Sequence, residues 1–250
     1  MRFVAIIPAR YHSSRLPAKA LIRIAGRSLI EWVYRRVCQA PQLDGVWVAT
    51  DDARICDEVQ RFGGEAILTR SDHPSGTDRV AEAAEQVEAD VYVNVQGDEP
   101  LISLAAIEGV CAPFRIDPQA QVATAKVRIE DPEEIRSPDA VKVVTDLQGY
   151  ALYFSRSSVP YRRGASAPVY KHLGIYAYRR SFLKGLHLLK PSPLERSECL
   201  EQLRFLENGV PVQVVEVAED SPGIDTLDDL ERVRPLLENA NRLQAVRLEI

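Results

Sequence analysis

The chain has 250 residues, of which 46% are hydrophobic, and its 31 basic and 36 acidic residues give a net charge of −5. It is long enough to bury a sizeable core, and the acidic balance does not favour nucleic acid or an anionic membrane as a partner. No Gly/Ser tract, low-complexity run or fixed-period repeat argues for a solenoid or tethered modules, so we expect a single domain over residues 1–250.

The first half of the chain alternates short apolar runs with amphipathic stretches. This pattern is typical of βα units around a mostly parallel sheet. We predict strands at residues 2–8, 45–50, 65–69 and 90–96. We predict helices at residues 28–40, 53–64 and 77–87.

The second half has a looser order. We predict strands at residues 121–129, 140–146, 150–157 and 172–178, with little helix between them, which indicates a mixed sheet. Helices follow at 181–189 and 193–209, then a strand at 210–217 and a helix at 226–240. We therefore expect an α/β protein, a three-layer sandwich with a mixed, mostly parallel sheet.

The four cysteines, Cys38, Cys56, Cys111 and Cys199, are widely scattered, which fits neither a disulfide framework nor a zinc site. The apolar stretch at the N-terminus is too short for a signal peptide or a membrane span, and Pro8 interrupts it. We expect a reduced, cytoplasmic protein that does not enter a membrane.

The loop after the first predicted strand, RYHSSRLPAKAL, carries Arg10, Arg15 and Lys19. No Asp or Glu precedes Glu31, and the loop has neither the GxGxxG nor the GxxxxGK[ST] fingerprint. A single loop arginine is usually solvated surface. The mutual repulsion of three cations without acidic neighbours would be relieved by a polyanion such as a triphosphate, to which Ser13 and Ser14 could also donate.

The stretch VYVNVQGDEP ends a buried strand and then presents Asp98. A charged turn is the plain interpretation. However, a carboxylate beside a bound triphosphate is repulsive unless a divalent metal lies between them, and Mg²⁺ takes one or two protein carboxylates plus phosphate oxygens. Asp98 is therefore a candidate metal ligand.

The stretch GIDTLDDLERV begins the last predicted helix. Thr226 and Asp229 have the spacing of a capping box, and acidic residues suit the first turn of a helix. Asp225 has no such structural role and is the candidate for a second metal ligand.

A further motif, HPSGTDR, contains Thr77, which can cap the helix that follows. Its Ser75 and Gly76 would allow backbone to approach a base or ribose closely. Alone, the motif is a helix start.

Other polar residues are weak candidates when taken alone. His172 lies in a predicted strand, where a histidine is more often packed in the core. Arg156 ends a strand and is either surface or a grip for a carboxylate. Glu201 and Gln202 lie on a predicted helix, where exposure to solvent is the plain expectation.

Taken together, these stretches resemble the 3-deoxy-manno-octulosonate (Kdo) cytidylyltransferase family, whose motifs occur in the same order over nearly the whole chain. The resemblance implies a glycosyltransferase-A-like nucleotidyltransferase fold, a homodimer and dependence on Mg²⁺. It also implies that CTP and Kdo are the substrates and that CMP-Kdo, a precursor of lipopolysaccharide, is formed with pyrophosphate.

The resemblance further implies roles for particular residues. Arg10, Lys19, Asp98 and Asp225 would be catalytic, with Asp98 and Asp225 as the metal ligands. Nucleotide binding would involve Ala9, Arg10, Arg15, Lys19, Ser75 and Gly76. The sugar would be bound by Gln96, Arg156, His172, Tyr176, Glu201 and Gln202. One departure is Ala18, where the family usually has glycine; if that position needs a positive φ, alanine costs about 1 kcal/mol.

Two alternatives remain at this stage. One is a cytidylyltransferase for another acid sugar, such as a sialic acid. The other is a non-catalytic module that binds sugar nucleotides, which would not need both Asp98 and Asp225. Their joint presence favours an enzyme.

Overall fold

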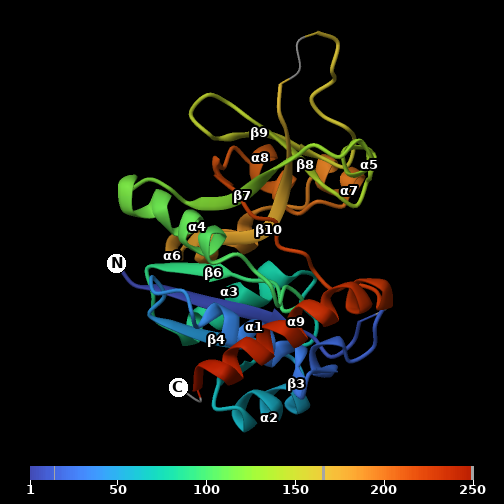
Figure 1. Ribbon diagram of the computed structural model, residues 1–250. Coiled ribbons are helices and arrows are strands. Elements are labelled where there is room, and N and C mark those ends of the chain that lie inside the picture. The colour runs from blue at the N-terminus through green and yellow to red at the C-terminus, as the bar shows by residue number, and fades with distance from the viewer. Residues whose placement is uncertain (14, 165–166, 249–250) are drawn as a thin grey trace. The chain divides into compact units, whose positions relative to one another are not determined.

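A computed structural model describes residues 1–13, 15–164 and 167–248, shown in Figure 1. Ser14, one of the expected phosphate donors, lies outside the described residues. The chain forms two compact units, each described by itself below. Unit 1 comprises residues 1–3, 89–93 and 105–220, and unit 2 comprises residues 4–88, 94–104 and 221–250.

The sheet of unit 2 is parallel, as the alternating pattern predicts. It contains β1 (Phe3–Ala9), β4 (Gly45–Thr50) and β5 (Glu65–Leu68), in that order. Most of β1 is fully buried, with Val4 to Ile7 at 0% exposure, because a parallel strand of this kind is covered on both faces. The strand ends at Ala9. The loop of residues 10–21, which carries Arg10, Arg15 and Lys19 and is called the cationic loop below, begins there.

The α-helices of unit 2, among the residues described, are α1 (Leu29–Val37), α2 (Ala53–Arg61), α3 (Gly76–Gln86) and α9 (Leu227–Leu248). The first and the last share one apolar core, in which Trp32 of α1 lies with Leu230 and Val233 of α9. The C-terminal helix α9 therefore packs against α1.

The loop region of unit 2 contains short elements that were not predicted. They are the 3₁₀ helix η1 (Lys19–Leu21) and the hairpin strands β2 (Arg23–Ile24) and β3 (Arg27–Ser28).

The prediction that Thr77 caps the following helix is wrong. Ser75 is the cap of α3, and its side chain accepts a hydrogen bond from the Asp78 amide.

Unit 1 contains a mixed sheet, as expected. Its strands are β6 (Val91–Asn94, of which Val91 to Val93 belong to this unit), β7 (Val122–Ile129), β8 (Lys142–Thr145), β9 (Ala151–Ser155), β10 (Val169–Arg179) and β11 (Val212–Val217). The strand β7 is antiparallel to β10 and parallel to β11. The strands β8 and β9 are antiparallel to each other, and β8 also pairs with β10.

The helices of unit 1 depart most from the predictions. They are α4 (Leu104–Ile116, of which all but Leu104 belong to this unit), α5 (Pro132–Arg136), α6 (Arg180–Gly185), α7 (Pro193–Glu198) and α8 (Gln202–Glu207), with the 3₁₀ turn η2 (Leu186–Leu188). Neither α4 nor α5 was predicted, and α4 contains Pro113, which in sequence suggests a break. The single helix expected at 193–209 is wrong, because Cys199 adopts a left-handed conformation with φ of 52° and separates α7 from α8.

The predicted fold class is confirmed. The chain has the predicted α/β class with a mixed, mostly parallel arrangement of strands and flanking helices. All four cysteines are free thiols. Among the described residues, no helix combines the length and the apolar character needed to cross a membrane. The single domain over residues 1–250 stays a prediction.

Candidate functional site

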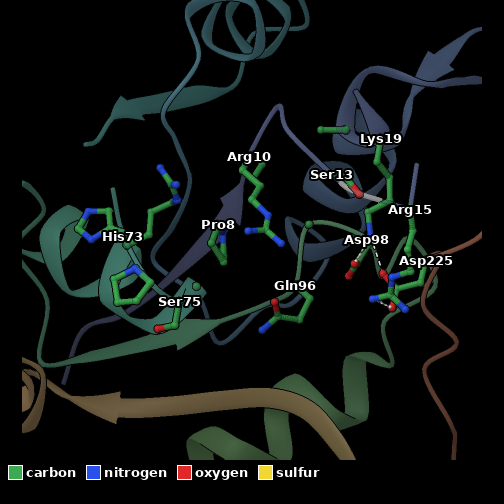
Figure 2. A pocket seen from close by; sticks show the side chains of 16 residues that line it. Pro8, Arg10, Ser13, Arg15, Lys19, His73, Ser75, Gln96, Asp98 and Asp225 are labelled. Carbon is green, nitrogen blue, oxygen red and sulfur yellow. Dashed lines mark hydrogen bonds and ion pairs between the residues drawn. The ribbon is translucent and has the colours of Figure 1, made fainter. Parts of the chain in front are cut away.

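A pocket of about 390 Å³ lies in unit 2 at the end of β1 (Figure 2). This volume falls within the usual range for small-molecule sites. Side chains from four separate stretches of the sequence line it. All residues that the sequence analysis assigned to the nucleotide and the metal are among them: Ala9, Arg10, Arg15, Lys19, Ser75, Gly76, Asp98 and Asp225.

The cationic loop is folded back on itself. The Ala18 amide donates to the Tyr11 carbonyl at 3.2 Å, and the Leu16 amide donates to Ser13 Oγ at 3.4 Å. Leu16 is buried in the apolar core of unit 2. The Arg54 guanidinium lies 3.4 Å from the centre of the Tyr11 ring, a cation–π contact at the start of the loop. The loop is therefore fixed at several points, and its cations are held in place.

Ala18 occupies the left-handed region, with φ of 52° and ψ of 30°. The conditional expectation of the sequence analysis thus applies: alanine stands where the backbone favours glycine, at a cost of about 1 kcal/mol. The conformation places Lys19 at the start of η1, one residue later.

We expect Ala18→Gly to leave the protein as stable or slightly more stable, because relief of strain is partly offset by the greater freedom of the unfolded chain. Ala18→Val should lower Tm by at least about 2–4 °C, since a β-branched residue fits this region poorly. The control is Ala81→Gly within α3, which should cost about 1 kcal/mol. Thermal melts would contradict this account if Ala18→Gly and Ala81→Gly were equally destabilising.

Lys19 lies between the two candidate metal ligands. Its Nζ donates to Asp98 Oδ2 at 2.5 Å and to Asp225 Oδ1 at 2.9 Å. The Arg15 guanidinium pairs with the other oxygen of Asp225 at 3.0 Å (Figure 2). The expectation that these cations lack acidic partners is therefore wrong for Lys19 and Arg15, because the fold supplies carboxylates that are distant in sequence.

The pKa of Lys19 reflects these contacts. Partial burial alone would lower it, but the charges and hydrogen bonds of Asp98 and Asp225 outweigh burial and raise it above its ordinary value. Lys19 is therefore a fixed positive charge at neutral pH.

Backbone contacts hold the two carboxylates together. The Ile224 amide donates to the Asp98 carbonyl at 2.9 Å, and the Ile224 side chain is fully buried. The turn before Asp98 requires glycine, because a Cβ at Gly97 would lie 2.8 Å from the carbonyl oxygen of Pro8. The segment that carries Asp225 is thus anchored beside Asp98 by the core.

Arg10 differs from the other two cations. It points into the middle of the pocket (Figure 2), and it forms no ion pair within the described part of the chain. Together with Arg15 and Lys19 it outnumbers Asp98 and Asp225 by one positive charge. The pocket is thus suited to an anion, and more so if it also holds a divalent cation.

Among the described residues that line the pocket, Asp98 and Asp225 are the acidic ones. The residues described contain no group of three or more His, Cys, Asp or Glu side chains arranged for a metal ion. A Mg²⁺ ion needs no such group when phosphate oxygens and water complete its coordination. Asp98 and Asp225 therefore fit a metal that is bound together with a phosphate ligand.

The loop that precedes α3 forms another wall of the pocket. Ser75 Oγ donates to Asp78 Oδ2 at 2.7 Å, and Gly76 lies against the Pro8 ring, with 3.5 Å between Pro8 and the position of a Cβ. The His73 ring contacts the Glu82 carboxylate through Nε2. The loop is therefore fastened to the helix that it begins.

Sequence reasoning missed several residues that line or support this pocket. Arg79 lines it, is 4% exposed, and donates to Thr69 Oγ1 at 2.6 Å and to Asp51 Oδ2 at 3.0 Å. His73 lines it beside Ser75. Both lie in the HPSGTDR motif, from which only Ser75 and Gly76 were assigned to the nucleotide, so the signal was present but His73 and Arg79 were not singled out.

The residues assigned to the sugar divide between the units. Gln96 lines the pocket of unit 2. Arg156, His172, Tyr176, Glu201 and Gln202 belong to unit 1.

His172 and Tyr176 lie together on β10. Their ring centroids are 5.4 Å apart, and the His172 ring also meets Phe154 edge to face at 5.0 Å. His172 Nε2 is 2.9 Å from Thr124 Oγ1. Burial lowers the pKa of His172 to about 3, so this ring is neutral at neutral pH and can bind only through neutral hydrogen bonds. Burial also raises the pKa of Tyr176 well above its ordinary value.

Arg156 follows the last residue of β9 and is held mainly by carbonyl groups. Its Nε donates to the Glu198 carbonyl at 2.8 Å, and its Nη1 donates to the Pro138 carbonyl at 2.9 Å. Glu201 is the N-cap position of α8, and Gln202, which is 6% exposed, is its first residue. The expectation that these two are simply solvent-exposed is wrong for Gln202.

Comparison with known proteins gives this chain a family. A family model described as "Cytidylyltransferase" matches residues 4–219. A 3-deoxy-manno-octulosonate cytidylyltransferase from Syntrophotalea carbinolica is 49% identical over 93% of this chain and 97% of the relative.

Solved structures agree. The structure of CMP:2-keto-3-deoxy-manno-octonic acid synthetase complexed with CTP is 48% identical in sequence and has a TM-score of 0.93. The match covers 96% of this chain and 100% of the synthetase chain. The structure of 4-diphosphocytidyl-2C-methyl-D-erythritolsynthase from Anaerococcus prevotii is 14% identical, with a TM-score of 0.62. The match covers 95% of this chain and 99% of the synthase chain, and it shows a shared fold only. The predicted nucleotidyltransferase fold is confirmed, and the chain belongs to the cytidylyltransferase family, among the 3-deoxy-manno-octulosonate cytidylyltransferases.

Proposed function

We propose that this enzyme transfers the cytidylyl group of CTP to Kdo, forming CMP-Kdo and pyrophosphate. The observation that carries the proposal is the pocket of unit 2, in which the three cations of the cationic loop and the carboxylates of Asp98 and Asp225 lie together with Ser75 and Gly76. The identity to Kdo cytidylyltransferases over nearly the whole chain supports the choice of substrates.

In the proposed reaction the anomeric hydroxyl of Kdo attacks the α-phosphorus of CTP, and pyrophosphate leaves with the electron pair of the broken bond. No protein nucleophile is needed, because such transfers depend on positioning and on stabilisation of charge. Arg10, Arg15 and Lys19 bind the β- and γ-phosphates and stabilise the leaving group. When bound by Asp98 and Asp225, Mg²⁺ supplies charge neutralisation and favours ionisation of the attacking hydroxyl.

The test is release of pyrophosphate from CTP and Mg²⁺ in the presence of Kdo, of a sialic acid, or of no sugar. The proposal expects release that depends on Kdo. Release with sialic acid alone would mean that the enzyme activates a different acid sugar. Binding of CTP without release in any reaction would support the non-catalytic alternative instead.

The sugar side of the proposal assigns the Kdo carboxylate to Arg156. We expect Arg156→Ala to raise KM for Kdo about thirty-fold or more, the effect of losing a charged hydrogen-bonding partner, with KM for CTP nearly unchanged. Arg128→Ala is the control, because Arg128 is an exposed arginine of the same unit that pairs with exposed Glu130. Steady-state kinetics with each substrate varied would contradict the assignment if both KM values rose equally.

We also propose that the enzyme works in the cytoplasm as a homodimer and that its product is used for lipopolysaccharide. Exposed apolar side chains in unit 1, Leu152 at 62% and Tyr161 at 87% exposure, support a contact with a second copy. Sedimentation analysis tests the dimer, and a monomer at enzyme concentrations used for assays would contradict it.

A further inference from the structure

The last residue of α7, Glu198, has an unusual set of partners. Its Oε1 accepts from Ser155 Oγ at 2.7 Å, and its Oε2 accepts from the Arg156 amide at 3.0 Å. The Tyr153 hydroxyl also donates to Oε1, at 3.5 Å. The carboxylate forms no ion pair among the residues described, so its partners are two neutral hydroxyls and a backbone N–H. These contacts join the end of β9 to the end of α7.

The same glutamate contacts the Arg156 side chain through its backbone carbonyl, which accepts from Nε at 2.8 Å. With Nη1 on the Pro138 carbonyl, the guanidinium is fixed by two neutral acceptors. Within the described part of the chain, Nη2 has no hydrogen bond. The N–H groups of Nη2 are therefore available to donate to an anion, as arginine does to carboxylates.

A buried lysine holds Arg156 from the other side. Lys142, at 0% exposure, donates through Nζ to the Arg156 carbonyl at 2.7 Å and to the carbonyls of Ser137 at 2.6 Å and Ala140 at 2.5 Å. Burial lowers the pKa of this ammonium, and the positive charge of Arg156 lowers it further. A buried ammonium is costly, and this one joins the Arg156 backbone to the segment that carries Ser137 and Ala140, which fixes the position of Arg156.

We infer that Glu198 is a positioning residue for Arg156 and that it sets the sugar subsite by joining Arg156 to the turn that carries Glu201 and Gln202. The turn is short and well fixed: Cys199 is left-handed, Leu200 is 6% exposed, and the Leu200 amide donates to the Glu195 carbonyl. The α8 helix that follows packs against β9. The inference rests on the proposed binding of the sugar acid by Arg156.

The same helix offers a matched control. Glu195 accepts from Arg204 Nε at 2.9 Å and from the Ser192 amide at 3.1 Å, so it closes an ion pair between α7 and α8 without contacting Arg156. Glu195→Gln and Glu198→Gln thus remove the same charge from the same helix, but only the second change reaches Arg156.

In steady-state kinetics, we expect Glu198→Gln to raise KM for Kdo about tenfold, because glutamine has no negative charge and only one acceptor oxygen, so it cannot accept from both the Arg156 amide and Ser155 Oγ as the carboxylate does. KM for CTP should stay within about twofold of the wild-type value. Glu195→Gln should lower Tm and leave both KM values nearly unchanged below the melting range. A rise in both KM values with Glu198→Gln, or an equal rise in KM for Kdo with Glu195→Gln, would overturn the inference.

A double-mutant cycle separates this inference from the proposed function. If Glu198 acts through Arg156, adding Glu198→Gln to Arg156→Ala should cause no further rise in KM for Kdo. If Arg156→Ala raises KM for Kdo and Glu198→Gln does not, the inference fails while the sugar assignment stands. If neither changes KM for Kdo, the assignment of Arg156 to the sugar fails, and the inference fails with it.

A milder variant covers the case in which Glu198→Gln does not fold. Ser155→Ala removes one hydrogen bond to Oε1 and leaves the charge in place. It should raise KM for Kdo about two- to fivefold, with KM for CTP unchanged. An unchanged KM for Kdo in a folded Ser155→Ala enzyme would also overturn the inference.

Discussion

Asp98→Ala is expected to fold normally and to lose roughly a thousand-fold or more of kcat, the largest effect that we predict. Its carboxylate is one of the two that would bind Mg²⁺, and metal ligands at a phosphoryl-transfer site act mainly in the transition state. The fold should survive, because Lys19 keeps its contact with Asp225 and the Asp98 backbone carbonyl still accepts the Ile224 amide.

The matched control is Asp228→Ala. Asp228 is an exposed acid in the first turn of α9, three residues after Asp225, and it does not line the pocket. It should retain nearly full activity. Thermal melts and kcat at saturating Mg²⁺ check both variants, and near-normal turnover of a folded Asp98→Ala enzyme would remove Asp98 from the mechanism.

Lys19→Ala should weaken binding of CTP at least tenfold and leave binding of CMP nearly unchanged. A charged contact to phosphate contributes about 1.5–3 kcal/mol, and only CTP offers the β- and γ-phosphates. The loss has a second cause, because Lys19 lies between Asp98 and Asp225 and its removal leaves the two carboxylates to repel the triphosphate. Higher salt should reduce the difference in CTP affinity between the wild type and Lys19→Ala, since charges in contact with solvent are screened over about 10 Å.

Arg23→Ala is the control for this loss of charge. Arg23 lies four residues from Lys19, but it pairs with Glu58 and does not line the pocket. Calorimetry of the wild type and both variants with CTP and CMP would measure the effect. Equal losses for the two nucleotides would show that Lys19 contacts the α-phosphate or the ribose, against the assignment proposed above.

Much of the fold could be predicted because its signals are local. The strand β4 was predicted at residues 45–50, where it lies, since its apolar run is bounded by turn residues. The Thr226–Asp229 capping box was also predicted, and the structure has both hydrogen bonds, at 3.0 and 3.2 Å. Spacing within one helical turn determines such a motif, so the sequence is sufficient.

The partners of the cationic loop could not be predicted in the same way. Asp98 is 79 residues and Asp225 is 206 residues from Lys19, and only the folded chain brings them within 2.9 Å. A count of charges along the sequence therefore mistook a paired cluster for an unpaired one. The break between α7 and α8 was missed for a different reason, because nothing in the type of residue at Cys199 favours a left-handed conformation.

Arg156 in unit 1 is held in place largely by backbone groups. Sequence motifs pointed to Arg156, but its acceptors are the carbonyls of Glu198 and Pro138, which have no signature in the sequence. Lys142 similarly binds three carbonyls. Residues that act on the backbone of a functional residue are found only when the fold is known.

The most direct test of the central claim is the fate of labelled phosphorus during turnover with CTP, Mg²⁺ and Kdo. Attack at the α-phosphorus predicts that label from [α-³²P]CTP appears in the sugar nucleotide and that label from [γ-³²P]CTP appears only in pyrophosphate. Transfer of the γ-label to the sugar, or release of the γ-label as free phosphate, would contradict cytidylyl transfer at this site.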